Sequence, residues 1–104
     1  MQDKVQEMIN SGQVLMFSKT FCPYCTEAKN ILASASVDVE VHELDIIPDG
    51  AEMQDALQEI SKQRTVPNIF VAGQHIGGCS DLKAKIDNGK LLEIFDEAGI
   101  QYSL

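Results

Sequence analysis

The chain has 104 residues, 44% of them hydrophobic, and a formal net charge of −8 at pH 7. This length supports a modest core, so we expect residues 1–104 to form a single domain, and the acidic balance without a lysine or arginine cluster argues against a nucleic-acid partner. The N-terminal residues lack a basic stretch followed by an apolar block, and no segment has the length needed to cross a bilayer, so we expect a cytoplasmic protein without a membrane partner.

The first half of the chain predicts two helices that alternate with two strands. Val5, Met8 and Ile9 form an apolar helical stripe that Gly12 ends. The apolar run 14–17 is typical of a buried strand. A loop over 18–21 follows, and from Glu27 onward apolar residues recur at helical spacing. Residues 37–41 then alternate apolar and polar side chains, which predicts a second strand.

The second half predicts a turn over 48–50 and a helix over 51–62. Strand-like residues follow at 68–71, and a hairpin turn over 72–75 leads into Ile76. Gly77 and Gly78 end that strand, and two closing helices are expected over 81–88 and 90–98.

These elements predict a small mixed α/β sheet. Strand 14–17, the helix behind it and strand 37–41 form a βαβ unit, so the two strands should be parallel with a right-handed crossover. The later hairpin must be antiparallel. Helices should cover both faces of the sheet and leave the loop after strand 14–17 at the carboxyl edge, where open α/β sheets place their sites.

That loop leads into Cys22-Pro23-Tyr24-Cys25, two thiols at a spacing that permits a reversible disulfide. Cys22 is expected at the helix N-terminus, where unpaired N–H groups and the helix dipole favour a thiolate, and Lys19 adds a positive charge nearby. We therefore assign Cys22 as the nucleophile and Cys25, in the first helical turn, as the resolving thiol. Pro23 suits the first helical position because its φ is preset and it has no N–H to leave unpaired.

Three cysteines are too few for a disulfide scaffold, so a reducing compartment with a working dithiol fits better. Two structural alternatives stay open: a pair of packed cysteines, and a zinc site built from the three cysteines with His42 or His75. Structural zinc usually shows two closely spaced ligand pairs, which disfavours the second alternative.

Three separated motifs together resemble a dithiol glutaredoxin: residues 19–25 (KTFCPYC), 64–67 (RTVP) and 76–82 (IGGCSDL). The resemblance spans nearly the whole chain, with the motifs in the order of that family. It implies a thioredoxin fold, with a central four-stranded mixed sheet flanked by about five helices, glutathione as the co-substrate and no metal. The chain's expected partners are glutathionylated or disulfide-containing proteins and, indirectly, glutathione reductase with NADPH, and we take a monomer as the default.

The resemblance also implies roles for residues beyond the two catalytic cysteines. Thr65, Val66 and Pro67 match a loop whose cis-proline faces the active-site sulfurs and whose valine backbone pairs with the cysteine of glutathione like an added strand. Lys19 and Gln54 match positions that bind the glycine carboxylate. The remaining expected contacts of glutathione are Tyr24, Cys79, Ser80 and Asp81, of which Ser80 and Asp81 receive the γ-glutamyl end.

The implied activity is reduction of protein–glutathione mixed disulfides through Cys22 alone and of protein disulfides through Cys22 with Cys25. One alternative is a thioredoxin-like reductant driven by a flavoprotein reductase, although the chain has no tryptophan beside its two cysteines. The other is a carrier of a [2Fe–2S] cluster held by Cys22 and glutathione from two subunits, which Pro23 disfavours because cluster-binding relatives usually have a smaller or more flexible residue there.

Overall fold

A four-stranded mixed sheet with five helices makes up the computed structural model over the described residues 1–103. In chain order the elements are α1 (Gln2–Ser11), β1 (Val14–Ser18), α2 (Pro23–Ser34), β2 (Glu40–Glu43), α3 (Gly50–Ser61), β3 (Asn68–Val71), β4 (Gln74–Gly77), α4 (Cys79–Asp87) and α5 (Lys90–Ala98). No helix within residues 1–103 is long and apolar enough to span a membrane.

The strands lie in the order β2-β1-β3-β4, so β1 and β3 are central. β1 and β2 are parallel, with Met16 opposite Val41, and β1 is antiparallel to β3, with Phe17 opposite Asn68. β3 and β4 form an antiparallel hairpin with an irregularity between Ile69 and Phe70. The predicted parallel pair and antiparallel hairpin are therefore confirmed.

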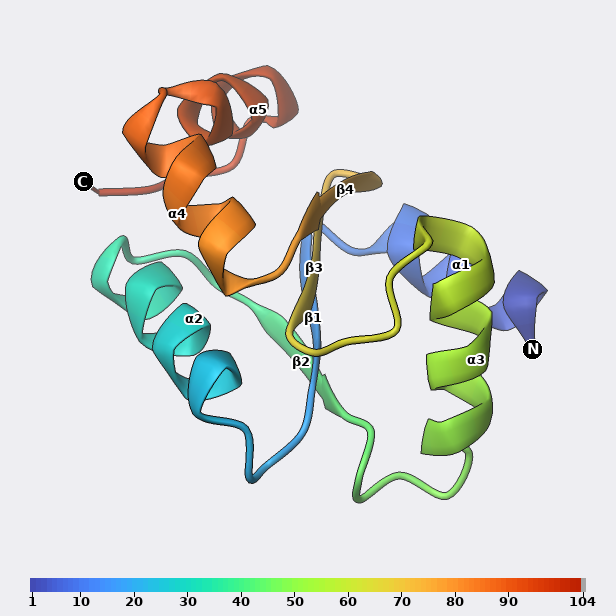
Figure 1. Cartoon of the computed structure of the whole chain (residues 1–104). Coiled ribbons are helices and arrows are strands. Elements are labelled where there is room, and N and C mark those ends of the chain that lie inside the picture. The colour runs from blue at the N-terminus through green and yellow to red at the C-terminus, as the bar shows by residue number, and fades with distance from the viewer. Residues whose placement is uncertain (104) are drawn as a thin grey trace.

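Helices cover both faces of the sheet, as Figure 1 shows, with α2, α4 and α5 on one side and α1 and α3 on the other. Successive residues of a strand point to opposite faces, and β1 is apolar at four consecutive positions because both of its faces are covered. Val14 and Met16 belong to the core under α2, α4 and α5, whereas Leu15 and Phe17 belong to the core under α1 and α3.

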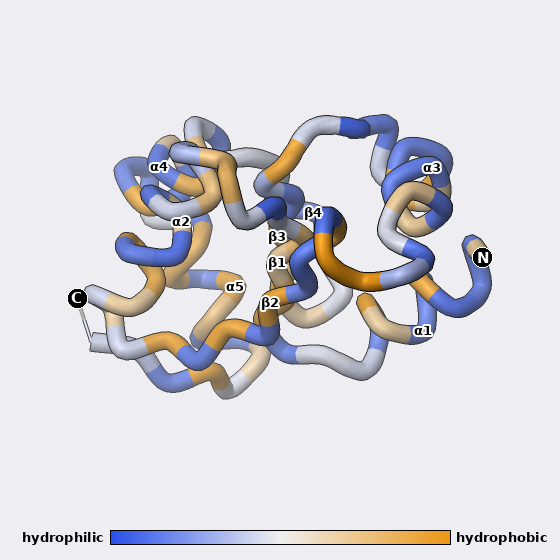
Figure 2. The backbone as a smooth tube through the Cα atoms, turned by 90° about the horizontal axis from the view of Figure 1, so that it is seen from below, coloured by the Kyte–Doolittle hydropathy of each residue, from blue (hydrophilic) through white to orange (hydrophobic). Residues whose placement is uncertain are grey.

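Strand β2 begins at Glu40 rather than at Val37, where the alternating pattern predicted its start. Val37 is buried and Val39 is partly buried against the core under α2, so their alternation comes from packing of the connection before the sheet begins. Figure 2 shows this alternation of hydrophobic and hydrophilic residues leading into β2. Pairing of β2 with β1 starts only at Glu40, which lies opposite Leu15.

The hairpin turn is also shorter than predicted, because His75 lies in β4 and only Ala72 and Gly73 form the connection. Both have positive φ, 50° and 81°, as a two-residue hairpin loop of the I′ type requires. α4 begins at Cys79, two residues earlier than predicted, whereas α2 begins at Pro23 as expected. The first turn of α4 is polar, and its capping contact determines the boundary.

Truncation of Phe95 tests the core under α4 and α5. This side chain is completely buried and lies against Tyr102, with 5.5 Å between the ring centroids. We expect Phe95→Ala to lower the free energy of unfolding by about 3–5 kcal/mol because it opens a cavity. The matched control is Phe21→Ala, since Phe21 is 73% exposed and its loss should change stability by less than about 0.5 kcal/mol. Urea unfolding measures both, and equal losses would contradict this assignment of the core.

Candidate active site

Cys22 occupies the N-cap of α2, four residues beyond the end of β1. Its backbone is extended, with φ −91° and ψ 114°, and its N–H donates to the Lys19 carbonyl at 3.2 Å. Its own carbonyl accepts the Thr26 N–H at 3.1 Å, which is the first intrahelical hydrogen bond. Pro23 stands at the first helical position as predicted, because that position needs no N–H donor.

The Cys22 sulfur lies between the first turn of α2 and the loop before β3. The Cys25 N–H donates to Cys22 Sγ at 3.3 Å, and Cys22 Sγ lies 3.7 Å from the Val66 carbonyl oxygen, to which the thiol can donate. An N–H of the first helical turn has no acceptor within the helix, so a negatively charged sulfur at the N-cap gains a hydrogen bond and a favourable dipole. The contact holds Cys22 Sγ at the N-terminus of α2, beside the loop that contains Val66.

Cys25 differs from Cys22 in its exposure. Cys25 is completely buried, whereas Cys22 is partly exposed. Burial, and then its hydrogen bond with Cys22, raise the pKa of the Cys25 thiol above the ordinary value. Cys25 therefore stays protonated at a pH where an ordinary thiol begins to ionise.

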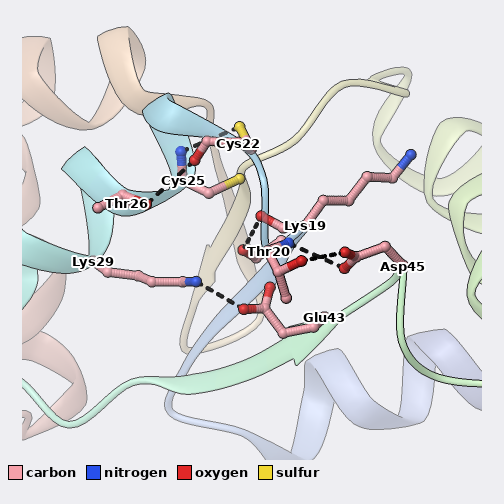
Figure 3. Close-up of polar contacts among 9 residues, drawn as sticks. Lys19, Thr20, Cys22, Cys25, Thr26, Lys29, Glu43 and Asp45 are labelled. Carbon is pink, nitrogen blue, oxygen red and sulfur yellow. Dashed lines mark hydrogen bonds and ion pairs between the residues drawn. The ribbon is translucent and has the colours of Figure 1, made fainter.

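Two polar contacts anchor the segments around the cysteines, as Figure 3 shows. The Asp45 carboxylate accepts from both the N–H and the hydroxyl of Thr20, which holds the loop before Cys22. Lys29 of α2 pairs with Glu43 of β2 at 2.8 Å. The Lys19 side chain extends away from both sulfurs in this view, whereas the Cys25 N–H donates to Cys22 Sγ.

Beside Cys22 a cleft of about 480 Å³ brings most of the predicted site residues together. Its lining consists of Tyr24, Gln63, Thr65, Val66, Pro67, Gly78, Cys79, Ser80 and Asp81. Lys19, Gln54 and the two cysteines Cys22 and Cys25 are not among these residues, although Cys22 Sγ lies 3.7 Å from the carbonyl oxygen of the lining residue Val66. Gln63 and Gly78 were not predicted, and both lie next to motifs that were.

The loop before β3 forms one wall of the cleft. Its Val66–Pro67 peptide bond is cis, as the resemblance implied. Gln54 donates its amide to the Arg64 carbonyl at 2.8 Å, and the Arg64 guanidinium pairs with Asp55. Gln54 thus supports this loop from α3.

The N-terminus of α4 forms the opposite wall. The Gly78 N–H donates to the Asp81 carboxylate at 2.9 Å, so Asp81 caps the helix. Gly77 has a φ of +116°, and a Cβ at this position would lie 2.3 Å from the nearer Asp81 carboxylate oxygen. The close approach of β4 to its own helix cap therefore requires glycine here.

Cys79 follows directly but is shielded from the cleft's solvent. It is 5% exposed, and its thiol lies 3.4 Å from a Glu27 carboxylate oxygen. The other oxygen of Glu27 pairs with Lys83 at 2.5 Å, so these three residues connect α2 with α4. Burial, followed by the hydrogen bond to Glu27, raises the pKa of the Cys79 thiol.

The two histidines considered for a zinc site each bond to another side chain. Within residues 1–103 no group of three histidine, cysteine, aspartate or glutamate side chains is placed to hold a metal ion. His42 bonds to Glu40 at 2.7 Å, and His75 bonds to Asn68 at 2.9 Å.

A family model and known sequences both match this chain to glutaredoxins. The family model for glutaredoxin matches residues 14–76. A glutaredoxin from Vernicia fordii is 48% identical over 96 residues, which cover 92% of this chain and 92% of that protein. Glutaredoxin-1 from Rhizophagus irregularis is 50% identical over 90 residues, covering 86% of this chain and 89% of that protein.

Solved structures agree with the sequence comparison. A buckwheat glutaredoxin–glutathione complex superposes with a TM-score of 0.91 at 39% identity and covers 96% of this chain and 91% of that one. The holo form of glutaredoxin C1 from Populus tremula x tremuloides gives 0.88 at 37% identity, with coverages of 93% and 96%. The predicted thioredoxin fold is confirmed, and this chain belongs to the glutaredoxin family of thiol oxidoreductases.

Proposed function

We propose that this protein reduces protein–glutathione mixed disulfides through Cys22 alone, and protein disulfides through Cys22 together with Cys25. The observation that supports this most directly is the contrast between the two thiols. Cys22 is partly exposed beside a cleft and accepts a helix N–H, whereas Cys25 is buried three residues later. Cys22 Sγ is thus placed to meet a substrate, whereas the buried Cys25 Sγ is placed to react with Cys22.

The dimensions and polarity of the cleft suit glutathione. Val66 offers backbone groups on one wall, to which the cysteine of the tripeptide can add like a short strand. On the other wall, the N–H groups at the start of α4 suit the γ-glutamyl carboxylate, and Asp81 suits its ammonium. We assign Lys19 as the cation for the glycine carboxylate, although its side chain does not line the cleft. The glutathione complex of the buckwheat relative supports this choice of ligand.

In the reaction that uses one cysteine, the Cys22 thiolate attacks the glutathione sulfur of a protein–glutathione disulfide. The old S–S bond breaks as the Cys22–glutathione bond forms, and the substrate protein leaves as a thiolate that takes up a proton. A second glutathione thiolate then attacks the glutathione sulfur bound to Cys22. This step releases glutathione disulfide, regenerates Cys22, and supplies the two electrons that reduced the substrate.

The reaction that uses both cysteines begins when the Cys22 thiolate attacks a protein disulfide and forms a mixed disulfide with that protein. Cys25 then loses its proton and attacks Cys22 Sγ, which gives the Cys22–Cys25 disulfide and releases the reduced protein. Two glutathione molecules reduce this disulfide in turn. Because burial raises the pKa of Cys25, this second attack should accelerate as the pH rises.

Selective alkylation tests the assignment of Cys22 as the nucleophile. At pH 7 we expect iodoacetamide to modify Cys22 at least about tenfold faster than Cys25 or Cys79, because thiolates are the reactive species. Burial raises the pKa of both Cys25 and Cys79, so their modification should need a more alkaline pH than that of an ordinary thiol. Peptide mapping by mass spectrometry gives each rate.

The reduced Cys22→Ser variant is the matched control, since its two remaining thiols should both react slowly at pH 7. Faster modification of Cys25 than of Cys22 in the unaltered protein would reverse the assignment of roles.

Substitution of each cysteine separates the two reactions. Cys25→Ser should retain reduction of a glutathionylated peptide within about threefold of wild type but lose reduction of a protein disulfide, because only the second reaction needs a resolving thiol. Cys22→Ser should abolish both. An assay coupled to glutathione reductase and NADPH measures the rates, and equal loss in the two variants would contradict the division of roles.

The same purified protein tests the two alternative functions. Turnover with a flavoprotein thioredoxin reductase, and none with glutathione, would indicate a thioredoxin-like reductant. Brown colour and visible absorbance after anaerobic purification would indicate a bound [2Fe–2S] cluster. Glutathione-dependent turnover by colourless protein supports the function proposed here.

A further inference from the structure

Gln63 lies two residues beyond the end of α3, lines the cleft, and forms two hydrogen bonds to the loop that contains Val66. Its side-chain nitrogen donates to the Thr65 carbonyl at 3.1 Å and to the Pro67 carbonyl at 3.0 Å. The –NH₂ group of an amide has two hydrogens, so one side chain can satisfy both carbonyls. One glutamine therefore spans the residues on either side of Val66.

These bonds determine which backbone groups stay available at the cleft. The carbonyls of Thr65 and Pro67 both point to the Gln63 amide, whereas the Val66 carbonyl between them faces Cys22 Sγ at 3.7 Å. The Arg64 carbonyl is bound by the Gln54 amide at 2.8 Å. Of these four consecutive carbonyls, the one directed at the reactive sulfur is that of Val66.

Gln63 is itself held in place by a partly buried polar network. Its backbone N–H donates to Ser61 Oγ at 3.3 Å, and the Asn68 side-chain amide donates to the same oxygen at 3.1 Å. The Ser61 hydroxyl donates to the Leu57 carbonyl at 2.7 Å, within α3. Asn68 is 1% exposed at the start of β3, so the network fixes both ends of the loop before a substrate arrives.

We propose that Gln63 is a positioning residue that presents the Val66 backbone to the cysteine of glutathione. It acts through the loop and does not touch the reacting sulfur. By holding the two flanking carbonyls, Gln63 keeps the backbone N–H and carbonyl of Val66 aligned for strand-like pairing. The loop then loses less conformational entropy when glutathione binds. This inference rests on the proposed use of glutathione as the substrate of the cleft.

The test compares Gln63→Met, which keeps the length of the side chain but removes both donors, with Gln63→Glu, which places a carboxylate against two carbonyl oxygens. We expect Gln63→Met to raise the KM for a glutathionylated peptide about tenfold, the effect of losing one to two hydrogen bonds, with kcat within about twofold of wild type. Gln63→Glu should raise KM further. The control is Gln74→Met, at an exposed position of β4, which should behave as wild type.

Two further measurements distinguish positioning from misfolding or direct contact. The rate of Cys22 alkylation should stay unchanged in both Gln63 variants, which shows that the nucleophile and its helix are intact. The ¹³C resonances of the Thr65 and Pro67 carbonyls should shift in glutathione-free Gln63→Met and stay constant in the control. A shift in the ligand-free variant would show that the two hydrogen bonds form before glutathione binds.

The outcomes also separate this inference from the proposed function. If wild type turns over with glutathione and Gln63→Met has the same KM, or if the two carbonyl resonances do not move, the positioning role is wrong and the function stands. If wild type shows no glutathione-dependent turnover, the proposed function fails first. A loss of kcat equal to the loss of kcat/KM would also overturn the positioning role.

Discussion

The hydrogen bond from the Cys25 N–H to the Cys22 sulfur is the interaction on which the rest of the site depends. It exists because β1 ends at Ser18 and α2 begins at Pro23, so a sulfur occupies the N-cap where an oxygen usually accepts the free N–H. β1 is buried on both faces, and the turn after it is anchored by Asp45. Cys22 is thus held close to the end of a buried, central strand.

Strand directions explain why distant segments meet at this sulfur. β1 ends at the same sheet edge where β3 begins, because the two strands are antiparallel and Phe17 lies opposite Asn68. β4 ends at that edge as well, with Gly77 opposite Ile69. The start of α2, the loop over 64–67 and the start of α4 therefore converge without any long connection. The cleft follows from the topology, and its chemistry follows from the residues at three element ends.

The sequence was sufficient where a local pattern coincided with a tertiary requirement. The buried strand at 14–17 and the parallel and antiparallel pairings were predictable in this way, whereas the grouping of Tyr24 with the residues near Pro67 and Asp81 came from the resemblance to a family. The start of β2 was not, because Val37 and Val39 alternate for packing on a helix rather than for pairing in a sheet. Gln63 was missed because its partners are backbone carbonyls. No sequence pattern shows which backbone carbonyls will accept a hydrogen bond from a side chain.

The link between α2 and α4 has a consequence for how the molecule responds to oxidants. The chain holds three sulfhydryl groups, an odd number that would ordinarily leave one free to cross-link two molecules. Cys79 is enclosed between the helices and bonded to a carboxylate that Lys83 already engages. Cys79 is therefore poorly placed to meet another sulfur, whereas the Cys25 N–H already contacts Cys22 Sγ at 3.3 Å, so Cys22 and Cys25 are the pair that the fold holds close together.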